Sequence, residues 1–245
     1  MNKTVLITGS TRGIGRSTAI EFAKNNYNIV INYKQSEKLA EELKKHLINT
    51  YKVEVLTIKA DISIEEEVIN MIDTIINKFN TIDVLVNNAG IAIDTTIEDK
   101  TPDNFKKILD TNLIGTFLTS KHVSKYMLEN KHGKIINISS TNGIDTYYPY
   151  SMDYDASKAA VISLTHNFAN YLAPYINVNC VAPGWVMTDM NKELDKDYIK
   201  EEESKILLNR FANPEEIAKV IYFLSTEDAK YINSTVIRVD GGLNN

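Results

Sequence analysis

Residues 4–15 read Thr-Val-Leu-Ile-Thr-Gly-Ser-Thr-Arg-Gly-Ile-Gly, a short β-branched run that passes directly into a glycine-rich turn. Glycine lets the backbone turn sharply and approach a phosphate group closely. A helical pattern follows, and the start of a helix attracts anions through its free N–H groups and its dipole. Glycines alone also occur in purely structural turns, but this order of strand, turn and helix predicts a nucleotide site. The expected phosphate-binding residues are Gly9, Ser10, Thr11, Arg12, Gly13, Ile14 and Gly15.

The same alternation continues along most of the chain. Further apolar runs lie at 29–32, 53–58, 84–87, 134–139, 177–181 and 235–239, with amphipathic helical patterns between them. Such strands are typical of a parallel sheet covered on both faces, so we expect an α/β, Rossmann-type doubly wound fold of about seven strands. We find no linker and expect one domain over 1–245. A charged insertion at about 188–209 is either a solvated helix pair or a lid over a substrate cleft.

Composition and charge exclude several classes of protein. The 245 residues are 43% hydrophobic and 24% charged, which is ordinary for a globular chain and too apolar for disorder. The net charge of −5 offers no general attraction to nucleic acid or anionic membranes. We find no signal-peptide core, no apolar stretch long enough to span a bilayer, and a single cysteine, so a cytoplasmic protein is expected. The four histidines lack metal-ligand spacing, and no metal is expected.

The end of the second apolar run predicts which dinucleotide binds. A site for NAD usually carries a carboxylate there, which accepts a hydrogen bond from the ribose 2′-hydroxyl. This chain has Tyr33 at about that place, followed by Lys34, and no acid occurs between Ile31 and Ser36. Lys34 and Arg12 would attract the 2′-phosphate of NADP(H), which a carboxylate would repel. The alternative is that both cations are solvated surface residues.

A second set of polar residues lies where the strand ends should converge beside the glycine-rich turn. Tyr154 and Lys158 are four residues apart and share a helix face, although such a pair also occurs by chance on surface helices. Ser140 follows one apolar run, and the Asn-Asn-Ala-Gly of 87–90 ends another. Asn112 lies inside a helical pattern, which asparagine disfavours. Because the carboxyl ends of the strands line the ligand crevice of such sheets, we expect these groups to form one site.

Together these features resemble the short-chain dehydrogenases/reductases over essentially the whole chain. The motifs that carry the resemblance are T-G-x-x-x-G-x-G at 8–15, Asn-Asn-Ala-Gly at 87–90, Asn112, Ser140, Tyr154 with Lys158, Pro-Gly at 183–184 and Asp-Gly-Gly at 240–242. Within the family, the segments 179–190 and 210–218 are most similar to the β-ketoacyl-acyl-carrier-protein reductases.

The resemblance implies a role for each polar residue. Tyr154 would donate a proton to a carbonyl oxygen, and Lys158 would lower the pKa of that phenol and hold the nicotinamide ribose. Ser140 would hydrogen-bond the carbonyl oxygen; Ser139 is the competing serine, but the family pattern S-S-x-x-G favours the second. Asn112 would hold a water that feeds protons toward Lys158. Further implied cofactor contacts are Tyr33, Lys34, Asp61, Ile62, Asn88, Ala89, Gly90, Tyr154, Lys158, Pro183, Gly184, Val186 and Thr188.

The expected activity is NADPH-dependent reduction of a 3-oxoacyl thioester, such as 3-oxoacyl-acyl-carrier protein. The alternatives are a dehydrogenase of another small alcohol or sugar, and a catalytically inactive nucleotide sensor, which would not require the proton-relay residues. The family also uses basic residues to dock the acidic carrier protein. Lys131 would serve at one such place, but Asn170 stands at the other and puts the carrier in doubt.

The loop before Tyr154 departs from the family by being one residue longer and rich in tyrosine. Its Tyr147, Tyr148 and Tyr150 would either stack on a substrate or pack against another subunit. The family implies a homotetramer built from two long helices, here at about 103–130 and 154–173, and the terminal strand.

Overall fold

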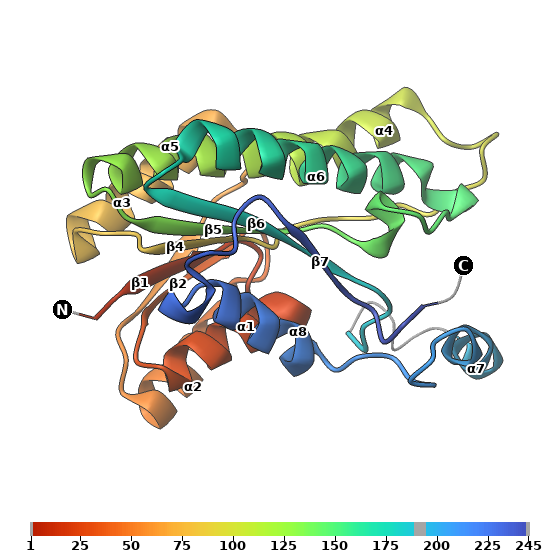
Figure 1. Cartoon of the computed structure of the whole chain (residues 1–245), viewed down its shortest axis with the longest axis horizontal. Coiled ribbons are helices and arrows are strands. Elements are labelled where there is room, and N and C mark those ends of the chain that lie inside the picture. Colours follow the sequence, from red (N-terminus) through yellow and green to blue (C-terminus); the bar gives the residue numbers. More distant parts are fainter. Residues whose placement is uncertain (1, 189–194, 244–245) are drawn as a thin grey trace.

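The computed structural model describes residues 2–188 and 195–243. Within them, seven parallel strands form one sheet in the order β3-β2-β1-β4-β5-β6-β7 (Figure 1). The strands are β1 (Thr4–Ile7), β2 (Asn28–Tyr33), β3 (Val55–Lys59), β4 (Val84–Asn87), β5 (Gly133–Ile138), β6 (Ile176–Pro183) and β7 (Val236–Val239). The strand order reverses between β1 and β4, which is where ligands bind in doubly wound sheets. The prediction of a Rossmann-type fold of about seven strands is confirmed.

Helices cover both faces of the sheet because the strands are apolar on both sides. In β1, Val5 and Ile7 belong to one buried core and Leu6 to the other, as the alternation of side chains along a strand requires. Figure 1 shows α1, α2 and α8 on one face and α3, α5 and α6 on the other. Their bounds are α1 (Gly13–Lys24), α2 (Glu37–Tyr51), α3 (Glu65–Phe79), α5 (Gly115–Glu129), α6 (Met152–Leu172) and α8 (Pro214–Leu224).

The first of the two long helices expected for assembly is interrupted. It begins as α4 (Pro102–Leu109), where Thr101 and Asn104 form a reciprocal cap. A π-helical turn then spans Asp110–Ile114, before α5 continues. Such π-helical turns frequently occur at functional sites, and this one contains Asn112. The expectation of one continuous helix over about 103–130 is therefore corrected, because the backbone widens into a π-helical turn at Asn112.

The segment after β6 forms the expected insertion, of which residues 189–194 lie outside the described part of the chain. Asp195 caps α7 (Lys196–Ser204), a helix with no buried residue. The chain then returns to the end of the sheet, where the N–H of Leu207 donates to the carbonyl of Gly242 at 3.1 Å. Of the helices that the structure describes, none has the length and apolarity to cross a membrane.

Candidate active site

The glycine-rich loop between β1 and α1 adopts left-handed backbone conformations at two glycines. Gly9 has a φ of +61°, and a Cβ there would lie 2.9 Å from Cα of Ala89. Gly13 has a φ of +52°, and a Cβ there would lie 3.3 Å from the methyl carbon of Thr188. The loop is therefore packed between the end of β4 and the start of the insertion. The first turn of α1 holds no acidic residue, so its N–H groups are open to phosphate.

Asn88 ties this loop to the end of β4. Its amide nitrogen donates to the carbonyl oxygens of Thr8, at 2.9 Å, and Gly9, at 3.0 Å. In return, the Thr8 hydroxyl accepts the backbone N–H groups of Asn88 and Ala89, each at 3.0 Å. The ribose contact implied for Asn88 stays a prediction, and the structure shows that the side chain also shapes the phosphate loop.

The two cations expected at the 2′-phosphate are held at the end of β2. The Nζ of Lys34 lies 2.5 Å from the Oδ2 of Asp61, and the Arg12 guanidinium donates to the Ser36 hydroxyl at 2.7 Å. Burial opposes ionisation of Asp61, but Lys34 and Ser63 outweigh it and lower the pKa of the carboxyl. Tyr33 is buried beside them. Lys34 and Arg12 each already have a partner at the end of β2, and their contact with a 2′-phosphate stays a prediction.

The remaining cofactor residues form walls and turns. Ile62 is buried and would contact a Cβ on Gly115 at 2.6 Å, so that glycine admits the isoleucine. Val186 is buried and pairs with Ala212 after the insertion. Pro183 ends β6, and a Cβ on the following Gly184 would meet the Asp240 side chain at 2.8 Å. These residues shape the crevice through packing, and Gly184 is required for the close approach.

The residues present fit a phosphorylated dinucleotide. The Ser10 hydroxyl in the glycine-rich loop is buried and has no hydrogen-bond partner within residues 2–188 and 195–243. A buried polar group normally has a partner, and a ligand oxygen would supply one. The left-handed glycines and the start of α1 form the cradle, and Arg12, Lys34 and Ser36 surround the expected position of the ribose.

The π-helical turn presents Asn112 to the end of β4 and to α6. Its Oδ1 accepts the N–H of Ile91 at 2.8 Å, and its amide nitrogen donates to the Ile91 carbonyl and the Ser157 hydroxyl, each at 3.0 Å. Ser157 donates in turn to the Tyr154 carbonyl at 2.6 Å. A Cβ on Gly90 would lie 3.4 Å from both the Asn112 Oδ1 and the Lys158 Nζ. Asn112 and Lys158 therefore meet across this glycine.

Tyr154 and Lys158 lie together as the spacing predicts, at the end of β5. The Lys158 ammonium is buried, donates to the Ile138 carbonyl at 2.8 Å and lies 5.4 Å from the centroid of the Tyr154 ring. Burial lowers the pKa of Lys158 to about 8, a shift that the nearby Cys180 partly opposes. Ser140, itself buried, lies close enough to Tyr154 to oppose the rise in the pKa of the phenol. The expected catalytic groups are thus in one place.

Burial, rather than Lys158, dominates the pKa of Tyr154 in the chain alone, and the effect of Lys158 on the phenol stays a prediction. Burial raises the pKa of Tyr154 to about 12, and the charges of Asp155 and Asp94 add to that effect. The Ser140 side chain acts in the opposite direction, but its effect is weaker. Lys158 directs its ammonium to the Ile138 carbonyl, so burial dominates at the phenol.

The two adjacent serines have different surroundings. Ser139 is buried and its hydroxyl donates to the carbonyl of Lys158 at 2.8 Å, which ties β5 to α6. The Ser140 hydroxyl donates to the Oδ1 of Asn142 at 3.1 Å and approaches Tyr154. This geometry favours Ser140 as the serine that faces a substrate.

Sequence reasoning missed five polar residues that hold these groups: Asn32, Ser36, Asn142, Asp155 and Ser157. Asn32 accepts the N–H of Gly9 at 3.2 Å from inside β2. Asp155 accepts the Asn142 amide at 2.8 Å, beside Ser140. An asparagine within an apolar strand was an available signal for Asn32. The others are unremarkable in sequence, because their partners come from distant positions.

The tyrosine-rich loop and α7 form the rim of the crevice. Tyr147 is 80% exposed and Tyr150 50%, while the rings of Tyr148 and Tyr150 lie 5.5 Å apart. The Trp185 ring stacks on Phe211 at 5.2 Å. Its indole N–H donates to Glu202 of α7 at 3.0 Å, so Trp185 is an anchor for the insertion.

Two of the histidines contact single polar side chains from other elements of the fold. His122 lies 2.7 Å from Glu65, and His166 lies 2.9 Å from the Ser234 hydroxyl. Across the described ranges, His, Cys, Asp and Glu do not gather in groups of three that could hold a metal ion.

Comparisons with known proteins agree with this geometry. The family model described as enoyl-(acyl carrier protein) reductase matches residues 9–244. The 3-oxoacyl-[acyl-carrier-protein] reductase FabG of Staphylococcus epidermidis is 39% identical over 244 residues, which cover 99% of each chain. ElxO with NADP bound superposes with a TM-score of 0.91 at 37% identity over 98% of each chain. Levodione reductase gives 0.92 at 34% identity over 98% of this chain and 96% of its own. The chain is therefore a member of the short-chain dehydrogenase/reductase family of oxidoreductases.

Proposed function

We propose that this chain is an NADPH-dependent reductase of 3-oxoacyl thioesters, with 3-oxoacyl-acyl-carrier protein as its main substrate. The observation that carries the proposal is the meeting of Ser140, Tyr154 and Lys158 beside a phosphate loop that has two cations at its ribose end. The S. epidermidis and Synechocystis relatives that bear this activity in their names match nearly the full length of the chain.

When bound, NADPH supplies a hydride to the substrate's carbonyl carbon. Tyr154 donates the proton to the carbonyl oxygen, and with a pKa of about 12 it remains protonated through the neutral range. Ser140 hydrogen-bonds the same oxygen and stabilises its developing charge. The Lys158 ammonium, near the ring, stabilises the phenolate that remains. Asn112 donates a hydrogen bond to Ser157 and meets Lys158 across Gly90, so it helps to hold Tyr154 and Lys158 in place.

The cofactor preference follows from charge at the end of β2. Gly9 to Gly15 and the start of α1 would hold the diphosphate, while Arg12, Lys34 and Ser36, which lie at the end of β2, would hold the 2′-phosphate. Asp61 neutralises part of the Lys34 charge, so Arg12 carries more of the preference. ElxO, a similar protein, is known with NADP bound. We expect at least about a tenfold preference for NADPH over NADH in kcat/KM, because one charge-assisted contact contributes roughly 1.5–3 kcal/mol.

The substrate is tested by following NADPH oxidation with a panel of carbonyl compounds. The panel contains acetoacetyl thioesters of coenzyme A and of acyl carrier protein, simple cyclic diketones, and sugars. We expect kcat/KM to be highest for the thioesters. A higher value for the diketones would reject the thioester assignment and favour the small-ketone alternative, since levodione reductase shares the fold at a TM-score of 0.92. No turnover of any compound would support a nucleotide sensor.

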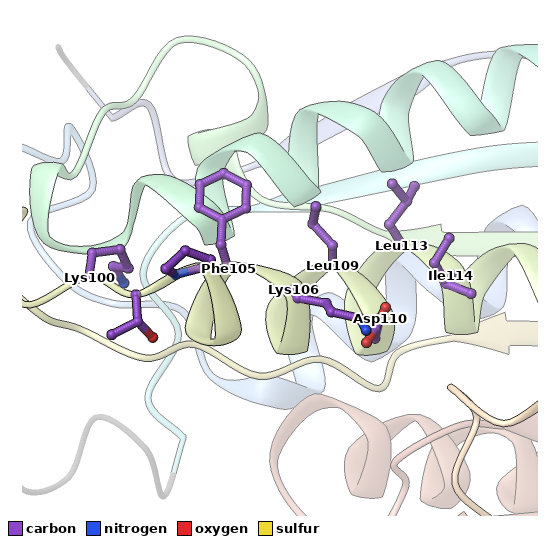
Figure 2. Close-up of a pocket in the computed structure, with 9 residues that line it drawn as sticks. Lys100, Phe105, Lys106, Leu109, Asp110, Leu113 and Ile114 are labelled. Atoms are coloured by element: carbon purple, nitrogen blue, oxygen red, sulfur yellow. The ribbon is translucent and has the colours of Figure 1, made fainter.

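We also propose that the chain assembles as a homotetramer through α4, α5 and α6. A groove of about 630 Å³ runs along α4 and the π-helical turn, and Figure 2 shows Phe105, Leu109 and Leu113 pointing to one side of it. Ile114 and Phe117 extend the exposed apolar surface. A patch of this kind favours burial against another copy. Light scattering is expected to give four times 27.7 kDa, and a monomer mass would reject the assembly.

Lys131 supports docking of an acidic carrier protein less strongly than its charge suggests. Its ammonium lies 5.7 Å from the centroid of the Tyr175 ring, which holds the side chain against the molecule. Asn170 adds no charge. The thioester panel tests whether the carrier protein is recognised, because acyl carrier protein and coenzyme A carry the same reacting group.

We place the enzyme in the cytoplasm, where a lone buried cysteine remains reduced.

A further inference from the structure

The turn that follows Ser140 is connected to α6 through a carboxylate that the proposed reaction does not use. Asp155 directly follows Tyr154 in α6, and its two oxygens accept different donors. Oδ1 accepts the amide of Asn142 at 2.8 Å, and Oδ2 accepts the backbone N–H of Tyr148 at 2.9 Å. One carboxylate therefore holds both the turn after the catalytic serine and the tyrosine-rich loop.

Asn142 continues this connection to the catalytic serine. Its Oδ1 accepts the hydroxyl proton of Ser140 at 3.1 Å, and its backbone N–H donates to the Ser140 oxygen at 3.2 Å. An ionised carboxylate only accepts hydrogen bonds, so it requires Asn142 to turn its NH₂ toward Asp155. The amide oxygen of Asn142 is thereby turned toward Ser140. Asp155 thus sets the orientation of the Ser140 hydroxyl through two successive hydrogen bonds.

The backbone around these hydrogen bonds is closely packed. A single side-chain contact can therefore fix the position of the turn after Ser140 relative to α6. A Cβ on Gly143 would lie 2.6 Å from the carbonyl carbon of Lys158, so the 3₁₀ turn Thr141–Gly143 lies directly on α6. Asn142 can therefore reach Asp155 without a long or mobile side chain. Burial is the main reason that the pKa of Asp155 is raised, and its two donors oppose that shift.

We propose that Asp155 is a positioning residue, which orients the Ser140 hydroxyl through Asn142 and fixes the tyrosine-rich loop, as a wall of the substrate site, through the N–H of Tyr148. The inference rests on the proposed carbonyl reduction, because Ser140 acts there on the carbonyl oxygen. The two oxygens of the Asp155 carboxylate then have different effects on the kinetics, because each accepts a different donor. Loss of the Asn142 contact lowers kcat, and loss of the Tyr148 contact raises KM.

The experiment is a double-mutant cycle with Asp155→Ala, Ser140→Ala and the combined variant. We expect Asp155→Ala to lower kcat about tenfold when Ser140 is present, and by less than about threefold in the Ser140→Ala background. The rise in KM is expected in both backgrounds, because it arises at Tyr148. Equal losses of kcat in the two backgrounds would show that Asp155 does not act through Ser140 and would overturn the proposal.

Two further variants separate the contacts. Asn142→Ala leaves the Tyr148 contact intact, so it is expected to lower kcat about as much as Asp155→Ala while KM changes by less than about threefold. Asp155→Asn keeps the size of the side chain and guards against misfolding, but its amide can accept only at one end. A normal kcat and KM for Asp155→Asn would contradict the requirement for a carboxylate.

Asp94→Asn is the matched control. Asp94 is exposed and its charge acts on Tyr154 and Asp155, so its removal changes the local field while leaving the Asp155 contacts in place. We expect a change in kcat of less than about threefold. An effect equal to that of Asp155→Ala would show that only charge matters and would reject the positioning role.

The proposed substrate and the positioning role can fail independently. The cycle is measured on a simple diketone as well as on acetoacetyl thioesters, so a wrong thioester assignment does not remove the assay. Hydrogen–deuterium exchange of the free protein adds a readout without substrate. Asp155→Ala is expected to raise deuterium uptake in 140–150, and Asp94→Asn to leave it unchanged; unchanged uptake in Asp155→Ala would contradict the role of this carboxylate.

Discussion

The cofactor side and the substrate side of the crevice are held in place by different means. On the cofactor side, β1 and β2 are completely buried, and the loop that follows β1 is tied down by backbone groups and the Asn88 amide. On the substrate side, the tyrosine-rich loop exposes Tyr147, and α7 has no buried residue. The position of α7 depends on a few side-chain contacts, such as that of Trp185 with Glu202.

This difference determines how well each side of the crevice tolerates substitution. A buried loop with left-handed glycines tolerates few substitutions, because a Cβ at Gly9 would meet the backbone of Ala89 and one at Gly13 would meet the side chain of Thr188. An exposed rim can change its side chains at little cost in stability. We therefore expect the cofactor to be held by the buried side and the choice of substrate to depend on the rim.

Tyr154→Phe gives the largest expected effect and tests the residue at which the cofactor side and the substrate side of the crevice meet. Removal of the hydroxyl removes the proton donor, so kcat is expected to fall by roughly three orders of magnitude. The ring remains, so the Kd for NADPH should stay within a few-fold, as measured by fluorescence titration. Retention of more than about a tenth of kcat would remove Tyr154 from its role.

Gly9→Ala tests the buried side alone. Alanine at a φ of +61° is strained, and its Cβ would lie 2.9 Å from Cα of Ala89. These two penalties together amount to about 2–3 kcal/mol, which corresponds to a loss of NADPH affinity of roughly 30- to 150-fold. Calorimetric titration gives the Kd, and circular dichroism shows whether the fold persists. An unchanged Kd in a folded variant would mean that the loop is less constrained than its geometry indicates.

Lys158→Met tests the cost of the buried ammonium. The folded pKa of Lys158 is about 8 against an ordinary 10.5, so the charged form is disfavoured in the folded chain. That difference corresponds to roughly 3 kcal/mol as an upper bound, and the unpaired Ile138 carbonyl offsets part of it. We expect the variant to be inactive yet more stable than the parent by about 1–2 kcal/mol at pH 7 in urea unfolding.

The pH dependence of that gain has a definite sign. The unfolded parent holds the Lys158 proton more tightly than the folded one, so the parent gains stability as pH rises from about 8 to 10.5. The methionine variant has no such dependence at this position. The gap between the two proteins should therefore narrow over that range, and a gap that widens would contradict burial as the cause.

Tyr33→Asp combined with Lys34→Ala tests the choice of cofactor within the buried side. The new carboxylate accepts a hydrogen bond from a ribose hydroxyl and repels a phosphate, so the tenfold preference for NADPH is expected to vanish or invert. The measurement is kcat/KM with each cofactor. Arg12→Ala is the companion variant, expected to reduce the preference without inverting it. Equal use of both cofactors by the parent would show that neither cation reaches the ligand.

Trp185→Phe gives the smallest expected effect and lies on the substrate side. It retains an aromatic ring against Phe211 but loses the N–H donated to Glu202. One such bond contributes about 0.5–1.5 kcal/mol, so KM for the carbonyl substrate should rise by roughly two- to tenfold with kcat nearly unchanged. A large fall in kcat instead would show that α7 contributes to the chemistry, and the contrast between the two sides would weaken.

Three features could be predicted from the amino-acid sequence alone: the order of strands and helices, the glycine-rich loop, and the grouping of Ser140, Tyr154 and Lys158. These follow from local rules: apolar periodicity defines the elements, and parallel strands bring their carboxyl ends to one edge. Asn112 was also recognisable, although the π-helical turn that presents it was not.

The hydrogen-bond and ion-pair partners of these groups could not be predicted from the sequence and are known from the packed fold. It pairs Lys34 with Asp61, directs Lys158 to the Ile138 carbonyl, and connects Asp155 to Asn142 and Tyr148. It also raises the pKa of Tyr154, because burial depends on everything packed around the ring. Such partners come from separate elements, and no local pattern specifies which donor will face which acceptor once the elements are packed.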